Sequence, residues 1–176
     1  MIRKSFHVLG IFVLLFLSRQ GFTESKVYFS PNGGCDKAVI SWIDKSSSTL
    51  DIAIFTLTKD DIADSIIRAH KRGVKVRVIA DNMQSKCKGA DIDRLSRSGI
   101  PVVIPKHQGF MHNKYIVIDS STVVTGSYNF TNNATFKNDE NLIIIADIGG
   151  MYSAAFEILW QRWSSIIYER THRRDK

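Results

Sequence analysis

The stretch Met111–Asn141 reads MHNKYIVIDSSTVVTGSYNFTNNATFKNDEN, and the rest of the chain is organised around it. It opens with His112 and Lys114 one residue apart, and Ser127 and Asn129 follow with the same spacing. Residues two apart in a β-strand point to the same face, so each pair is predicted to share one. An imidazole, an ammonium, a hydroxyl and an amide on one surface would suit a phosphate oxyanion. The stretch therefore predicts a phosphate site that contains a histidine.

The residue types in this stretch suit phosphoryl chemistry. Lys114 offers a compact cation, and Ser127 and Asn129 offer neutral donors that can stabilise charge on phosphoryl oxygens. His112 could be a nucleophile or a general acid–base, because the unperturbed pKa of histidine lies near neutrality. A lone histidine is more often a structural hydrogen-bonder. Here it is followed at short offsets by Lys, Asp, Gly-Ser and Asn, which favours the catalytic interpretation.

Apolar periodicity outside this stretch predicts alternating strands and helices. Strands are expected at 26–30, 50–57, 74–80 and 100–104, with helices at 37–45, 59–72 and 91–98 between them. Asp36 is expected to cap the first helix, and Thr58-x-x-Asp61 resembles a capping box for the second. A hairpin at 114–119 and 122–125, a strand at 142–146 and a helix at 152–168 complete the pattern. The prediction is a single α/β domain with a mixed, mostly parallel sheet sandwiched between helices.

Residues 1–23 are predicted to be a signal peptide, which leaves residues 24–176 as the folded domain. Arg3 and Lys4 precede the apolar run 8–17, which is too short for a comfortable transmembrane span. The protein is then expected to be periplasmic or secreted, or membrane-anchored if the segment is not cleaved. The whole chain of 176 residues carries a net charge of +7 and stays basic without this segment, which favours a polyanionic partner.

Cys35 and Cys87 are the two cysteines, and in an oxidising compartment they form a candidate disulfide. The alternative is two free thiols, because sequence does not give the distance between them. Neither belongs to a Cys-x-x-Cys pattern, and the histidines are scattered, so no metal site and no cofactor is predicted. His107, five residues before His112, is either a groove residue or an ordinary loop residue.

The spacing of the polar residues resembles the signature of the phospholipase D superfamily. The matching pattern is His112-x-Lys114, four residues, Asp119, six residues, and Gly126-Ser127-x-Asn129. Similarity extends upstream through DIAIFTLT (51–58) and KRGVKVRVIAD (71–81). The length, the single motif copy and the signal-like start resemble the small bacterial endonuclease branch of that superfamily.

The resemblance implies a two-step, metal-independent phosphodiester cleavage. His112 of one subunit would form a phosphohistidine, and His112 of a second subunit would protonate the leaving oxygen and then activate water. Lys114 and Asn129 would hold the phosphate with help from Ser127. Asp119 would have a supporting role, and Glu140 would be the carboxylate that fixes the histidine tautomer.

A single motif copy implies a homodimer with a two-fold axis through the shared site. The favoured substrate is DNA, with RNA as a further candidate, cleaved by a non-specific endonuclease. No stable membrane partner is expected after signal removal. Sequence-independent phosphate contacts are expected from basic residues outside the motif, namely Lys86, Lys88, Arg94, Arg97 and Lys106.

Tyr128 and Phe110 lie beside the motif and are predicted either to stack on bases or to pack. The main alternative function is a phospholipase D-type hydrolase of phospholipids at a membrane surface, although no long apolar insertion lies near the motif. A non-catalytic nucleic-acid-binding protein with the same fold is a third hypothesis, and the intact signature argues against it.

Overall fold

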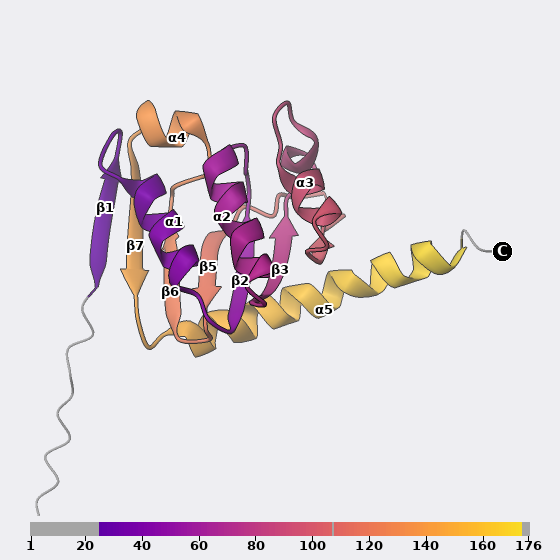
Figure 1. Ribbon diagram of the computed structural model, residues 1–176. Coiled ribbons are helices and arrows are strands. Elements are labelled where there is room, and N and C mark those ends of the chain that lie inside the picture. The colour runs from indigo at the N-terminus through magenta and orange to yellow at the C-terminus, as the bar shows by residue number, and fades with distance from the viewer. Residues whose placement is uncertain (1–24, 107, 174–176) are drawn as a thin grey trace, which may run out of the picture.

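Seven strands form one sheet that carries helices on both faces (Figure 1). The computed structural model describes residues 25–106 and 108–173, with side chains up to residue 164. The strands are β1 (Lys26–Ser30), β2 (Thr49–Ile54), β3 (Lys75–Ala80), β4 (Val102–Val103), β5 (Lys114–Ile118), β6 (Thr122–Gly126) and β7 (Glu140–Ile145). The helices are α1 (Cys35–Lys45), α2 (Asp60–Lys71), α3 (Ile92–Arg97), α4 (Asn132–Phe136) and α5 (Gly149–Arg173), with a 3-10 turn η1 (Gln84–Lys86).

The order of the strands in the sheet is β1-β7-β6-β5-β2-β3-β4. The mixed sheet is confirmed, and so are the parallel β2–β3 and β3–β4 pairs and the antiparallel β5–β6 hairpin. The expectation that the sheet is mostly parallel was wrong, because β5 lies antiparallel to β2, and β7 lies antiparallel to both β6 and β1. Short connections such as that between β5 and β6 allow only antiparallel pairing, whereas parallel neighbours need crossovers.

Alternating side chains on the strands divide the core into two layers. Ile52 and Ile54 of β2 belong to the layer covered by α1 and α2, whereas Ala53 faces Phe156 of α5. Arg77 of β3 strengthens the α5 layer, because it pairs with Asp51 and Glu157 and lies over the ring of Phe156. The predicted sandwich of a sheet between helices is therefore confirmed.

The ends of several helices differ from the prediction. Helix α1 begins at Cys35 after Gly34, whose φ is 82°, and Asp36 lies in its first turn instead of capping it. No capping box precedes α2, because Lys59 is its N-cap and the Thr58 amide donates to the Phe130 carbonyl (2.9 Å). Tertiary hydrogen bonding has thus overridden local capping preferences. Helix α4 was not anticipated.

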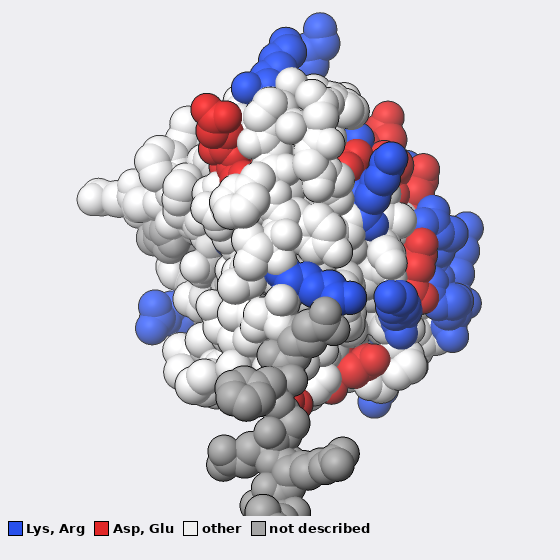
Figure 2. All heavy atoms as spheres, turned by 90° about the vertical axis from the view of Figure 1, so that its left-hand side faces the viewer, with Lys and Arg blue, Asp and Glu red and all other residues white. Residues whose placement is uncertain are grey.

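Charged side chains are unevenly distributed over the surface. Figure 2 looks onto the β1 edge, and the basic and acidic groups gather on the right-hand side of this view, where α1 lies. Val27 and Phe29 of β1 are exposed apolar residues. Within the described part of the chain, no helix is long and apolar enough to cross a membrane. The predicted signal peptide, residues 1–23, lies outside the described residues.

Candidate active site

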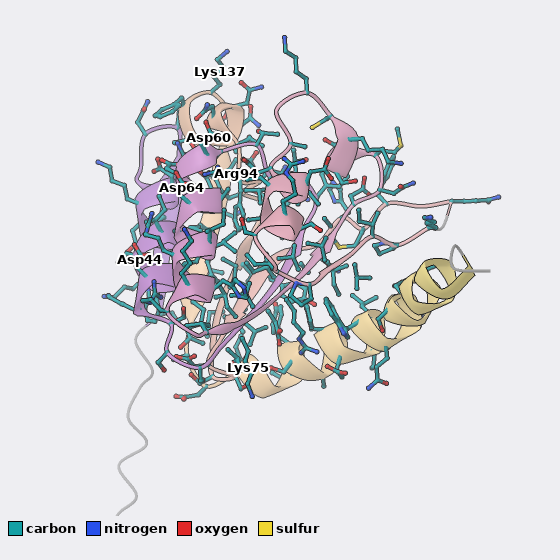
Figure 3. The ribbon with its side chains drawn as sticks, turned by 45° about the vertical axis from the view of Figure 1, so that its right-hand side comes forward. Asp44, Asp60, Asp64, Lys75, Arg94 and Lys137 are labelled. Carbon is teal, nitrogen blue, oxygen red and sulfur yellow. The ribbon has the colours of Figure 1, made fainter. Side chains whose placement is uncertain are left out.

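The predicted site residues other than Asp119 lie on segments that meet at one end of the strands, which is called the site edge below. Lys114 begins β5 and pairs with Ile54 at the end of β2, while Gly126 ends β6 and pairs with Leu142 of β7. Figure 3 shows the two ends of the sheet, with Lys137 after α4 at this edge and Lys75 at the opposite one. The segments beyond these strand ends carry the chemistry.

His112 and Lys114 lie together against the ring of Phe55. The His112 imidazole is tilted on Phe55, with ring centroids 4.5 Å apart, and the Lys114 ammonium lies 4.9 Å from the centroid of the same ring. The ammonium also donates to the His112 backbone carbonyl at 2.8 Å. His112 is exposed and Lys114 is half-buried, so a substrate can reach both.

Burial lowers the pKa of Lys114, and the nearby carboxylate of Glu140 partly offsets this effect. Glu140 accepts hydrogen bonds from the Ser127 hydroxyl (2.5 Å) and from the Asn138 side chain (3.0 Å). No hydrogen bond between Glu140 and His112 is present among the described residues of this chain. Its expected role in fixing the histidine tautomer is therefore not realised within a single chain.

The backbone of Gly126 explains why the signature needs glycine at this position. Its φ is 151°, and a Cβ atom there would lie 2.2 Å from the Asn141 carbonyl oxygen. That carbonyl accepts the amides of Ser127 (3.1 Å) and Tyr128 (3.3 Å). Since glycine alone allows this close approach, Gly126 brings the Ser127 hydroxyl next to the start of β7, where Glu140 lies.

Ser127 and Asn129 do not share a strand face as predicted, because β6 ends at Gly126. The residue between them, Tyr128, is fully buried and hydrogen-bonded to Thr135 (2.6 Å). Asn129 lies in the irregular segment that follows, and its buried Oδ1 has no hydrogen-bond partner among the described residues. A buried amide oxygen normally has a donor, so this atom is one that a bound molecule or water can satisfy.

The structure places Asp119 away from the cluster, at the opposite end of β5. Its carboxylate accepts hydrogen bonds from the amides of Ser47, Ser48 and Thr49 and from the hydroxyls of Ser47 and Ser48. Burial alone would raise the pKa of Asp119, but these hydrogen bonds outweigh it and lower the pKa well below the ordinary value. Asp119 supports the fold, and a catalytic role for it is not consistent with this position.

Asp81 is a site residue that the sequence reasoning missed. It is buried at the end of β3, and one carboxylate oxygen accepts the Met111 amide at 3.0 Å. The other oxygen accepts the amides of Met83 and Gln84. Asp81 thus fixes the backbone immediately before His112. Its place directly after a strand that ends at the site edge was the signal that could have identified it.

Three further sequence predictions concern Arg94, the two cysteines and His107. Arg94 pairs with Asp64 and Asp91, and Figure 3 shows Asp64 and Arg94 close together between α2 and α3, so Arg94 is not free for a phosphate. Cys35 and Cys87 are both free thiols, and the disulfide is absent. Burial raises the pKa of the Cys35 thiol. His107 is outside the described residues.

The assembled groups are a cation, a hydroxyl, an amide and a histidine on segments that meet at one end of the sheet. In the part of the chain that is described, no group of three or more His, Cys, Asp or Glu side chains is arranged to hold a metal ion. Lys114 can hold a phosphoryl oxygen, and the exposed His112 imidazole contacts the same Phe55 ring. This arrangement can support nucleophilic attack on phosphorus.

Comparison with known proteins identifies the family. Residues 39–160 match the family model "Cardiolipin synthase, PLD-like domain". A mitochondrial cardiolipin hydrolase of Chlamydomonas reinhardtii is 37% identical over 123 residues, which are 69% of this chain and 55% of that protein. A phospholipase D of Rickettsia conorii is 40% identical over 119 residues, which are 68% of this chain and 60% of that protein. The chain thus spans less than two thirds of the length of these curated relatives.

Two solved structures are similar over nearly their whole length. A phospholipase D family member, Nuc, from Salmonella typhimurium has a TM-score of 0.72 and 31% identity, covering 81% of this chain and 94% of that chain. NucT from Helicobacter pylori has a TM-score of 0.70 and 25% identity, covering 81% of this chain and 96% of that chain. The chain belongs to the phospholipase D superfamily.

Proposed function

We propose that this protein is a metal-independent phosphodiesterase that acts as a non-specific endonuclease on DNA, with RNA as a further substrate to be tested. The observation that carries the proposal is that His112 and Lys114 share the ring of Phe55. The segment with Ser127 and Asn129 begins at the same end of the sheet, where β6 ends. All four are residue types that bind or attack a phosphoryl group.

The proposed reaction has two successive steps at phosphorus. A His112 nitrogen bonds to phosphorus as the bond from phosphorus to the leaving oxygen breaks, and a second His112 gives its proton to that oxygen. Water then attacks phosphorus, passes a proton to the second histidine and releases the first one. Lys114 holds a phosphoryl oxygen through both steps.

The second histidine comes from a second copy of the chain, so the functional unit is a homodimer with a two-fold axis through the site. The exposure of His112 leaves it accessible to such a partner. Glu140 also fits this arrangement. Since it makes no hydrogen bond to its own His112, we place it against the His112 of the other subunit, where a carboxylate would fix the imidazole tautomer.

A polymeric substrate is supported by exposed lysines on the segments that surround the site. Lys86 and Lys88 follow β3, Lys106 follows β4, and Lys137 follows α4. Each of these segments begins or ends at the site edge. Cations distributed around a single phosphate site suit a chain of phosphates, because each can neutralise a neighbouring phosphate without reading the base.

Hydrolysis of phospholipid is the second candidate function. It is favoured by the names of the curated relatives, a cardiolipin hydrolase and a phospholipase D, and by the exposed apolar side chains Phe110 and Met83 in loops that reach the site edge. These residues do not belong to a long apolar insertion, which a lipid-binding entrance would need.

One assay panel separates these functions. Purified protein is incubated with single-stranded DNA, double-stranded DNA, RNA and cardiolipin vesicles, each with and without excess chelator, and His112→Ala is the control. We expect cleavage of DNA that survives the chelator and falls at least a thousandfold in His112→Ala. Hydrolysis of cardiolipin alone would establish the second candidate, and loss of activity in chelator would contradict the metal-independent mechanism.

A further inference from the structure

A chain of ring contacts joins His112 to Phe110 through Phe55. Phe55 contacts the His112 imidazole on one side, and Phe110 packs edge-to-face on Phe55, with ring centroids 5.9 Å apart and an interplanar angle of 79°. Phe110 is the outermost ring of the three. It lies in the loop between β4 and β5, two residues before His112.

Phe110 stays largely in contact with solvent, with 59% of its surface exposed. The other aromatic residue beside the motif, Tyr128, is only 1% exposed and uses its hydroxyl internally, so it cannot reach a substrate. The structure thus distinguishes two residues that look equivalent in sequence. Single exposed apolar residues are common, but this one is supported by a ring that also contacts the catalytic histidine.

The surroundings of Phe110 favour a flat aromatic partner over an acyl chain. Its neighbours in the loop, Gln108, Gly109 and Asn113, are exposed and polar or small. Lys106 is exposed four residues earlier and suits a neighbouring phosphate. An exposed ring near a cation is an arrangement with which proteins stack on single-stranded bases.

We propose that Phe110 is a stacking platform for the nucleobase next to the scissile phosphate, with Phe55 as its support. This subsite rests on the proposed endonuclease function and specifies how the substrate is held. It predicts that the enzyme needs a base, but no particular base, beside the bond that it cuts, because every base offers a flat π-face. It also predicts a preference for single strands, in which the base is free to stack.

The test uses short DNA strands in which one linkage is an ordinary phosphodiester and all the others are uncleavable methylphosphonates. The nucleotide next to that linkage carries either a base or an abasic sugar. We expect wild-type protein to cut the base-containing strand with a kcat/KM about tenfold higher, mainly through KM. Phe110→Ala should abolish this difference, so that the two strands are cut with similar kcat/KM.

Two further variants distinguish stacking from general damage. Phe110→Trp should retain the preference for the base, and Ile158→Ala, which removes an equally exposed apolar side chain on α5, should leave all rates unchanged. Thermal unfolding of each variant checks the fold. An unchanged base preference in Phe110→Ala overturns the proposal. A Phe110→Ala protein that no longer hydrolyses cardiolipin vesicles but still cuts DNA normally overturns it as well. Failure of wild-type protein to cut any nucleic acid would instead overturn the proposed function.

Discussion

Lys114 carries the positive charge that the proposed mechanism uses to bind phosphate, and its surroundings affect that charge in opposite directions. Burial lowers its pKa, which favours the neutral amine, while Glu140 favours the ammonium. The ring face of Phe55 adds a favourable contact for the cation. Burial, Glu140 and Phe55 therefore together set the pH range over which Lys114 stays charged.

The first prediction follows from that balance. In Glu140→Gln, the pKa of Lys114 should fall further because the stabilising carboxylate is gone, so Lys114 loses its proton at a lower pH. The alkaline limb of the kcat/KM profile should then move to lower pH, measured with a single-linkage DNA substrate between pH 7 and 10. Asp139→Asn, which removes an exposed neighbouring carboxylate, is the matched control. An alkaline limb that stays at the wild-type pH would contradict this account of Lys114.

At the scale of single residues, the sequence indicated which segments lie at this end of the sheet better than it indicated how their side chains are arranged. The segments that carry His112, Lys114 and Ser127 meet at one end of the sheet, because strand pairing brings them there. The shared strand face expected for Ser127 and its neighbour Asn129 was wrong, since the chain leaves β6 at Gly126. A positive φ at glycine and a close backbone approach are properties of the folded chain, and periodicity does not contain them.

At the scale of elements, loop and strand ends are held by single carboxylates. Asp81 holds the backbone before His112, and Asp119 holds the connection between α1 and β2 at the far end of the sheet. Both follow directly after a strand. The sequence placed the strands themselves nearly correctly, because their apolar runs are buried on both faces. It could not show which strand end each carboxylate serves.

Asp119 gives the second prediction, which concerns stability. Its pKa is lowered in the folded protein, so its contribution is complete above the unfolded value of about 4 and is lost as pH falls through the lower folded pKa. Asp119→Asn should therefore reduce the free energy of unfolding by about 1–2 kcal/mol at neutral pH. The difference from wild type should shrink as the pH falls below 4.

Urea unfolding at several pH values measures this difference, and Asp93→Asn on α3 controls for the loss of one exposed charge. Cleavage by folded Asp119→Asn should keep the wild-type kcat. A variant that is fully stable but inactive would show that Asp119 acts in catalysis after all.

At the scale of the whole molecule, the proposed site is incomplete in a single chain. One chain supplies one His112, and the two-step reaction proposed above needs two histidines at one phosphate. The surface around His112 also has to admit both a substrate strand and a second subunit. Activity should thus depend on assembly.

Dilution provides the third prediction. Activity per chain should be constant well above the dissociation constant of the dimer and should fall in proportion to enzyme concentration below it. Sedimentation at the same concentrations reports the dimer fraction, and trapped phosphohistidine should reach at most one per two chains. Undiminished activity at a concentration where only monomer sediments would refute the shared site.

The pairing of β1 with β7 also bears on when this protein becomes active during its synthesis. Lys26 pairs with Ile144, and Ser30 pairs with Glu140. The first strand, β1, therefore cannot pair until the last strand, β7, is present. Contacts so distant in sequence form late and slow folding. The strand that completes the sheet is also the one that delivers Glu140 to the site. A nascent chain therefore lacks its final strand, and Glu140 with it, until β7 has been synthesised.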